Sequence, residues 1–231
     1  MRWIWIRHGE TEENRQRRYH GHTDAPLNQA GMEQARKLSN LLACEKPDLF
    51  YTSDLLRSRQ TAEGLSAAWG IAPTPVPELR ELSFGDWEQL TYEELMSLAG
   101  ERARQWYDDP FQYAPPGGET VAQLGSRVDR LIKGVLRKLS DRAEERNSAD
   151  QEWSKGRHQR QGRKPEQTVV LVTHGGAIRW FQAAWMHGNP QLYWQMTGLG
   201  HGQAMIVRQT ADGWRLVTDS GRSDFGEESE T

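Results

Sequence analysis

The chain has 231 residues, with 29 lysines and arginines against 32 aspartates and glutamates, so its formal net charge at pH 7 is −3. This balance argues against a nucleic-acid partner, and the length suits one α/β domain with a large core. A single cysteine excludes an intramolecular disulfide, and no apolar run approaches the ~20 residues that span a bilayer. The chain starts with a strand pattern rather than a leader peptide, so we expect a cytoplasmic protein with no membrane partner.

The first half of the chain alternates between strand and helix patterns. Asn28 is expected to cap the first long helix, and Gly70 to end the second one. The apolar face of the first long helix is expected to comprise Met32, Ala35, Leu38 and Leu42. The predicted elements are a buried strand, a short helix or turn, a helix, a strand and a helix, over residues 1–6, 11–18, 28–43, 49–52 and 54–69.

The part of the chain after residue 70 begins with an extended segment. Pro73, Pro75 and Pro77 favour extended backbone, which leads to a group of carboxylates at residues 78–88. A Pro-Pro-Gly-Gly sequence at 115–118 predicts a loop. The remaining predictions are helical segments around 91–108, an amphipathic helix over 119–139, a strand over 169–172, a helix over 177–186, and a terminal strand pair over 203–208 and 214–218.

This order of elements predicts a three-layer α/β sandwich, with a mostly parallel central sheet and helices on both faces. In such sheets, ligands bind at the carboxyl ends of the strands. Arg7 and His8 directly follow the first strand, and His174 directly follows the strand over 169–172. The topology therefore brings both histidines to the ligand-binding edge.

We expect a single domain over residues 1–220. It is interrupted by a polar insertion at about 141–167, which has almost no apolar residue except Trp153. Such a segment favours a solvated helical extension or a mobile loop, and the alternative is a lid or an anion-docking arm anchored by Trp153. The tail over residues 221–231 is expected to be disordered.

The Arg7-His8-Gly9 sequence indicates a phosphate site. Arginine offers a planar fork of donors that matches phosphate oxygens, and a neutral imidazole can attack phosphorus and carry the phosphoryl group. Taken alone, the tripeptide fits a polar strand end equally well. Arg57, which follows the second predicted strand closely, adds an arginine in the same kind of setting.

Taken together and in order, the motifs of this chain resemble those of the histidine phosphatase superfamily, the phosphoglycerate mutase-like family, over about residues 2–209. The resemblance implies that His8 forms a phosphohistidine, while Arg7, Arg57 and His174 neutralise the phosphoryl group. Asn14 and the backbone N–H of Gly175 are implied as further phosphate contacts, and no metal or cofactor is implied. The motifs are Arg7-His8-Gly9-Glu10-Thr11, Leu27-Asn28-Gln29-Ala30-Gly31, Ser53-Asp54-Leu55-Leu56-Arg57, the carboxylates of 78–88, and Thr173-His174-Gly175-Gly176.

The leaving alkoxide needs a proton, and a carboxyl group is the expected donor. Glu81 matches the position of the family's acid because it lies four residues before Gly85. Its neighbours Glu78 and Glu88 are the alternatives. In the favoured interpretation, Glu81 protonates the leaving group and then activates water against the phosphohistidine.

The short interval between Glu81 and the loop at 115–118 resembles the phosphatase branch of the family, in which water reaches the phosphoenzyme. Pro116-Gly117-Gly118-Glu119-Thr120 is similar to a motif of α-ribazole phosphatases. The prediction is a metal-independent phosphomonoesterase for a small-molecule phosphate ester, either unspecialised or α-ribazole-5'-phosphate-specific. A phosphoglycerate mutase and a non-catalytic phosphate-binding module are the alternatives.

Three groups of residues have weaker interpretations. A basic segment after the nucleophile motif is interpreted as a solvated face rather than a selector of anionic substrates, and four aromatic residues are interpreted as core rather than as pocket wall. His201, in a glycine-rich turn, is assigned no role. The basic segment includes Arg15, Arg17, Arg18, His20 and His22, and the aromatic residues are Phe84, Trp87, Trp106 and Tyr107.

Overall fold

The computed structural model describes residues 1–154 and 166–217. Its described residues form a six-stranded sheet in the order β3-β2-β4-β1-β5-β6. The first four strands are parallel to one another, β5 pairs antiparallel with β1, and β6 pairs antiparallel with β5. The mostly parallel sheet that the sequence predicts is confirmed. The strands are β1 Arg2–Arg7, β2 Leu49–Ser53, β3 Thr74–Val76, β4 Thr168–Thr173, β5 Ala204–Thr210 and β6 Gly213–Leu216.

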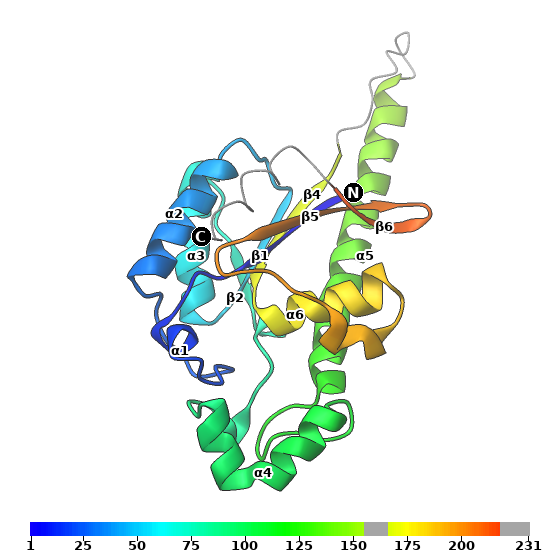
Figure 1. Cartoon of the computed structure of the whole chain (residues 1–231). Helices are drawn as coiled ribbons and strands as arrows, with labels where there is room; N and C mark the ends of the chain where they lie inside the picture. The colour runs from blue at the N-terminus through cyan, green and yellow to red at the C-terminus, as the bar shows by residue number, and fades with distance from the viewer. Residues whose placement is uncertain (155–165, 218–231) are drawn as a thin grey trace.

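Helices cover both faces of this sheet, as predicted for a three-layer sandwich (Figure 1). The pair α2 and α3 lies on one face, and α5 with α6 lies on the other, while α4 lies below the sheet. The helices are α1 Glu12–Arg15, α2 Gln29–Leu41, α3 Leu56–Trp69, α4 Tyr92–Asp108, α5 Val121–Ser154 and α6 Gly175–Trp180, followed by a π-helical turn at Phe181–Met186. Single-turn 3₁₀ segments lie at Pro77–Leu79 and Gly85–Trp87, and a longer one at Pro190–Gln195.

Strand β1 divides its side chains between the two layers of core. Trp3 and Trp5 belong to the larger hydrophobic cluster, together with buried residues of α5 and α6. Ile4 and Ile6 belong to the second cluster, with buried residues of α2 and α3. This split follows from the twofold alternation of side chains along a strand, and it holds the end of β1 rigidly between two packed layers.

One expected core residue is exposed. The buried residues of α2 are Gly31, Ala35, Leu38 and Ser39, and the buried stripe continues to Leu42, whereas Met32 is 57% exposed. Gly31 approaches the loop after β1 so closely that a Cβ there would lie 2.1 Å from the carbonyl oxygen of Glu10. This backbone contact turns position 31 toward the protein and its neighbour toward solvent, so the prediction for Met32 is wrong.

The polar insertion begins as helix. α5 continues without interruption through 141–154 to Ser154, which supports the helical extension over the loop for that part, and its far end projects beyond the sheet (Figure 1). Residues 155–165 and the expected disordered tail at 221–231 lie outside the described residues. None of the described helices combines the length and apolarity needed to cross a bilayer.

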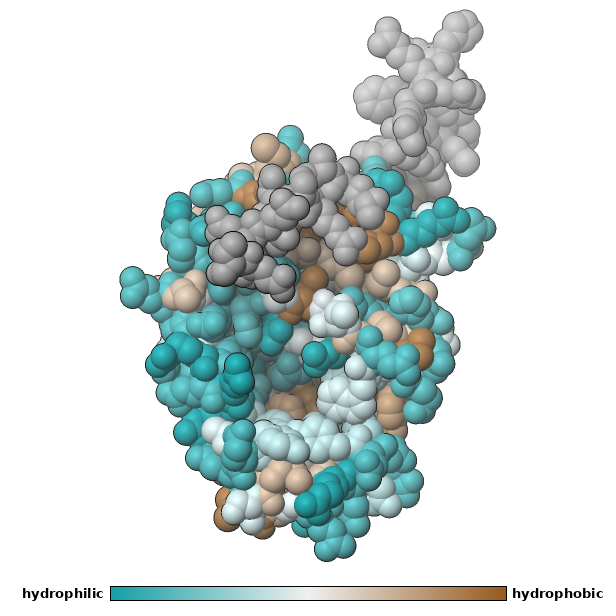
Figure 2. Space-filling view, in the orientation of Figure 1, coloured by the Kyte–Doolittle hydropathy of each residue, from teal (hydrophilic) through white to brown (hydrophobic). Residues whose placement is uncertain are grey.

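The aromatic residues of the second half are mainly core. Trp87 and Trp106 are 2% and 1% exposed, and their rings meet edge to face at 5.8 Å. Phe84 and Tyr107 are partly buried against the same cluster. Hydrophilic residues dominate the described surface in the view of Figure 2, with the hydrophobic ones in small separate areas.

Candidate active site

The ends of β1 and β4 bring the two motif histidines together. Arg7 pairs with Thr173 in the parallel ladder, and the N–H of His8 donates to the carbonyl oxygen of Thr173 at 3.0 Å. The next residues are therefore adjacent, and the rings of His8 and His174 lie 4.9 Å apart between centroids. The carboxyl edge of the sheet thus holds both side chains, where the sequence topology expects them.

The His8 ring is held in one tautomer. Its Nδ1 lies 2.6 Å from the carbonyl oxygen of Gly9, and a carbonyl only accepts, so Nδ1 carries the proton. Burial, followed by the charges of Arg57 and Arg7, holds the pKa of His8 well below its ordinary value. The ring is therefore neutral near pH 7, with its Nε2 lone pair available, which is the state that a nucleophilic imidazole needs.

His174 is also buried and neutral in this structure. Burial, then the charges of Arg57 and His8, hold its pKa well below the ordinary value. Its Nε2 lies 2.9 Å from Oγ of Ser53 and 3.3 Å from Oγ of Ser58. A phosphate dianion among these groups would raise the pKa of His174 and favour the protonated donor that the family resemblance implies.

Arg57 is completely buried, and burial lowers its pKa to about 10. Its guanidinium donates to the carbonyl oxygen of Gly21 at 2.7 Å and to that of Thr23 at 3.1 Å. Arg7 donates from Nη1 to the carbonyl oxygen of Leu199 at 2.7 Å. Loop carbonyls hold both guanidinium groups in place, so both are oriented before a ligand binds.

The carboxylate of Glu81 lies beside the first turn of α6. It accepts the N–H of Gly176 at 3.0 Å and the N–H of Leu82 at 2.8 Å. A Cβ on Gly175 would lie 3.6 Å from Cζ of Arg7 and 3.7 Å from Oε2 of Glu81, so these two side chains meet over Gly175. The predicted acid and the predicted phosphate clamp therefore belong to one site.

The alternative acid Glu88 has a structural role. Its carboxylate accepts the N–H of His22 at 2.6 Å and that of Thr23 at 2.5 Å. Burial raises the pKa of Glu88, but the hydrogen bonds from Thr23 and His22 outweigh it and lower the pKa overall. A carboxylate engaged in this way fixes a loop. Glu81 also accepts two backbone N–H groups, but its carboxylate meets Arg7 over Gly175, and this position beside the phosphate clamp favours Glu81 over Glu88 as the proton donor.

Asn14 has a local role that limits what it can offer a ligand. Its Oδ1 accepts from the N–H of Thr11 at 3.2 Å in the capping box of α1. The carboxamide nitrogen is then the part of Asn14 suited to donate to a phosphate oxygen. The amide of Gly175 is the first N–H of α6, a position that favours anions.

Two histidines that sequence reasoning did not assign are part of this site. His20 is 7% exposed, with Nε2 lying 3.1 Å from Nη1 of Arg57 and Nδ1 lying 3.2 Å from Oγ1 of Thr11. The ring of His201 lies 5.5 Å from that of His8. The solvated-face interpretation is wrong for His20, because the chain turns back after Arg17, whose φ is 56°.

Four buried nitrogens of this site have no hydrogen-bond partner among the described residues. They are Nε of Arg7, Nε of Arg57, Nδ1 of His174 and Nε2 of His201. Buried polar atoms are normally satisfied, and leaving one unpaired costs ~1–3 kcal/mol. Cationic and imidazole groups with spare donors, gathered around one neutral imidazole, form a site suited to a phosphate dianion.

The comparisons with known proteins agree with this geometry. The family model described as the histidine phosphatase superfamily (branch 1) matches residues 3–220. The chain therefore belongs to the histidine phosphatase superfamily, as its motifs predict. It is 32% identical, over 90% of its length and 83% of the relative, to a glucosyl-3-phosphoglycerate phosphatase of Mycolicibacterium vanbaalenii.

Other relatives indicate the same class. An adenosylcobalamin/alpha-ribazole phosphatase of Escherichia coli is 37% identical over 57% of this chain and 65% of the relative. Among solved structures, the alpha-ribazole phosphatase of Shigella flexneri superposes with a TM-score of 0.76, at 27% identity over 94% of this chain and 95% of that one. A mycobacterial glucosyl-3-phosphoglycerate phosphatase in complex with VO3 gives a TM-score of 0.74, at 28% identity over 94% and 96%.

Proposed function

We propose that this enzyme hydrolyses small-molecule phosphate monoesters through a phosphohistidine on His8, without a metal. The observation that carries the proposal is the neutral His8, with Nδ1 held by Gly9, facing cationic groups that have unpaired buried nitrogens. Phosphoryl transfer depends mainly on positioning and on neutralising the charge of the transferred group. Arg7, Arg57 and His174 supply that charge, with Asn14 and the N–H of Gly175 as further donors.

In the first step, Nε2 of His8 attacks phosphorus and the bond from phosphorus to the ester oxygen breaks. Protonated Glu81 transfers its proton to that oxygen, so an alcohol leaves and Glu81 becomes a carboxylate. In the second step, the carboxylate takes a proton from water, whose oxygen attacks phosphorus as the bond to Nε2 breaks. Orthophosphate leaves, and both His8 and Glu81 return to their starting forms.

Two classes of phosphate ester are the first candidate substrates to test. The relatives include phosphatases named for alpha-ribazole and for glucosyl-3-phosphoglycerate, and both names describe a phosphate ester on a hydroxylated, polar leaving group. Residues 116–120 carry the sequence that is similar to α-ribazole phosphatases. We retain α-ribazole-5'-phosphate as the specific candidate, an unspecialised phosphomonoesterase as the broader one, and the cytoplasm as the location.

The deciding experiment is phosphate release from a panel of monoesters by wild type and His8→Ala, with a chelator present. The panel contains α-ribazole phosphate, glucosyl-3-phosphoglycerate, 3-phosphoglycerate, sugar phosphates and 4-nitrophenyl phosphate. We expect release by wild type alone, and an acid-labile, base-stable phosphoenzyme after a rapid quench. Activity abolished by the chelator would contradict the metal-independent mechanism. Isomerisation of 3-phosphoglycerate faster than phosphate release would favour the mutase, and binding without turnover would favour the non-catalytic module.

A further inference from the structure

Arg127 and Glu119 form an ion pair directly behind the segment that carries Glu81. Arg127 lies in the second turn of α5, and Glu119 precedes the helix. Their side chains are 11% and 21% exposed. Nε of Arg127 donates to one carboxylate oxygen and Nη2 to the other, each at 2.9 Å. This bidentate geometry fixes both the distance and the orientation of the pair.

The other N–H groups of Arg127 bind the acid segment, defined here as residues 78–83. Nη1 donates to the carbonyl oxygen of Glu78 at 2.9 Å and to that of Arg80 at 2.6 Å. Nη2 donates to the carbonyl oxygen of Glu81 at 2.7 Å. An arginine has five N–H donors, so two of them serve Glu119 and three serve the acid segment.

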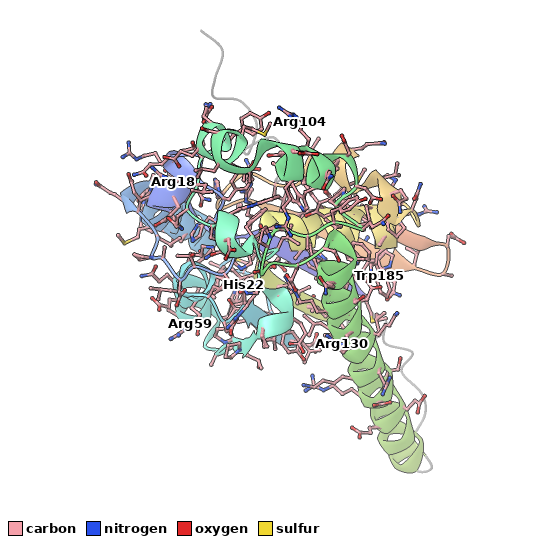
Figure 3. The ribbon with its side chains drawn as sticks, turned by 90° about the horizontal axis from the view of Figure 1, so that it is seen from below. Arg18, His22, Arg59, Arg104, Arg130 and Trp185 are labelled. Atoms are coloured by element: carbon pink, nitrogen blue, oxygen red, sulfur yellow. The ribbon has the colours of Figure 1, made fainter. Side chains whose placement is uncertain are left out.

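Glu119 holds the far end of the same segment. Its Oε2 accepts the N–H of Ser83 at 3.1 Å, and its own N–H donates to the carbonyl oxygen of Ser83 at 2.9 Å. His22 adds a second donor to the carbonyl oxygen of Glu81, at 3.0 Å from Nε2. Figure 3 places His22 near the middle of the view from below, close to the beginning of α5. The backbone on both sides of Glu81 is therefore held by α5 and by the loop that precedes it.

We propose that Arg127 and Glu119 are positioning residues for proton transfer by Glu81. A partly buried ion pair contributes little net stability in general, but five directed bonds onto three carbonyls and one carboxylate define a single backbone position. The glutamate side chain then reaches the first turn of α6 from a fixed origin. Proton transfer loses much of its rate with a displacement of about 1 Å. This inference rests on the proposed function, because it takes Glu81 as the general acid.

The effect of such positioning depends on the leaving group. An alkyl phosphate needs the proton because its alkoxide is a strong base, whereas 4-nitrophenyl phosphate releases a weak base that needs little help. We expect Arg127→Gln and Glu119→Gln to lower kcat/KM for an alkyl phosphate about tenfold or more while changing kcat/KM for 4-nitrophenyl phosphate about threefold at most. The comparison uses kcat/KM because it reports the first step, in which the leaving group departs, whereas kcat also contains the hydrolysis of the phosphohistidine, which is the same for both esters. Glu81→Gln should show the same selectivity, which identifies the step affected. The double variant should be about as active on the alkyl phosphate as the less active of the two single variants, because the two residues act as a unit.

Arg2→Gln is the matched control. It removes another partly buried ion pair, to Glu45, with side chains 17% and 21% exposed, at the opposite end of β1. Thermal unfolding and near-UV circular dichroism report whether each variant is folded, and Glu119→Gln serves if Arg127→Gln does not fold. Equal losses of kcat/KM on both substrates, or no loss on either, would overturn the positioning role while leaving the phosphatase reaction intact. A wild type inactive on both esters, or a Glu81→Gln without leaving-group selectivity, would instead contradict the proposed function and this inference with it.

Discussion

Gly176 and Glu81 approach each other so closely that no side chain fits between them. A Cβ on Gly176 would lie 2.2 Å from Oε1 of Glu81 and 3.0 Å from the hydroxyl of Tyr193. The same carboxylate oxygen accepts the N–H of Gly176 at 3.0 Å. A glycine in the first turn of α6 is therefore required by the position of the acid.

Replacing that glycine should displace the acid. In Gly176→Ala, the methyl group must push the carboxylate of Glu81 away, because Tyr193 is buried and blocks the other side. We expect kcat/KM for alkyl phosphates to fall by about 10²-fold, within the range for a lost general acid, with a smaller loss of kcat/KM for 4-nitrophenyl phosphate. Steady-state kinetics on the two substrates check this.

The neighbouring glycine offers a comparison. A Cβ on Gly175 would lie 3.6 Å or more from its nearest neighbours, Arg7 and Glu81, which is ordinary van der Waals contact. Gly175→Ala should therefore lose less activity than Gly176→Ala. A larger loss in Gly175→Ala would show that the steric argument for the acid is wrong.

The positions of the two motif histidines could be predicted from sequence because they follow directly on strands. β1 and β4 are apolar and fully buried in their central residues, so their positions in a parallel sheet, and the edge that holds His8 and His174, follow from the sequence pattern. Glu81 is predicted through the family resemblance, because its spacing from Gly85 matches the position of the family's acid. The placement of the two histidines depends on regular elements whose periodicity is visible in the residues themselves.

His20 and His201 lie in irregular segments, and nothing in their local sequence places them. His20 depends on the turn at Arg17, which has a positive φ. His201 depends on Gly202, whose N–H lies 3.2 Å and 3.1 Å from the carbonyl oxygens of Arg7 and His8, with a φ of 68°. Contacts between residues almost 200 positions apart are set by tertiary folding, so only the three-dimensional arrangement places His201 beside His8.

His201 should affect phosphate binding. Its ring lies beside His8, burial lowers its pKa to about 4, and its buried Nε2 is unpaired. A neutral ring there can donate to a phosphoryl oxygen. A hydrogen bond to a charged group contributes ~1.5–3 kcal/mol, so His201→Ala should lower kcat/KM about 10- to 100-fold and weaken inhibition by orthophosphate. His187→Ala, which removes an exposed histidine, should change neither quantity, and equal kinetics in the two variants would exclude a phosphate contact by His201.

Acid should destabilise the fold below the ordinary histidine range. Burial is the largest cause of a lowered pKa at four histidines of the site, His8, His20, His174 and His201. Each is neutral when folded but takes up a proton when unfolded below pH ~6.5. Their stabilisation is present above that pH and is lost as pH falls from it toward the folded pKa values, by up to ~1.4 kcal/mol per pH unit for each.

Thermal unfolding at pH 7.5, 6.5, 5.5 and 4.5 measures this slope. Saturating orthophosphate should flatten it, because a bound anion favours the protonated histidines of the folded state. His201→Asn should also flatten it by removing one of the titrating groups. A melting temperature that rises between pH 6.5 and 5.5 would contradict the neutral, buried state of these rings. For activity, the low pKa of His8 in the folded protein predicts that loss of the free nucleophile to protonation begins well below pH 6.5.

Two glycines of α5 should respond in opposite directions to the same substitution. A Cβ on Gly134 would meet no atom within 4 Å, whereas a Cβ on Gly125 would lie 2.2 Å from the ring of Trp180. Alanine stabilises a helix by ~0.5–1 kcal/mol relative to glycine, so Gly134→Ala should stabilise the protein by about that amount. In Gly125→Ala, overpacking against the indole costs ~1–3 kcal/mol and should reverse the sign. Denaturant midpoints with unchanged m-values check both. Stabilisation by both variants would mean that Trp180 moves freely, and the tight packing of α5 on α6 would then not hold the first turn of α6 beneath the acid.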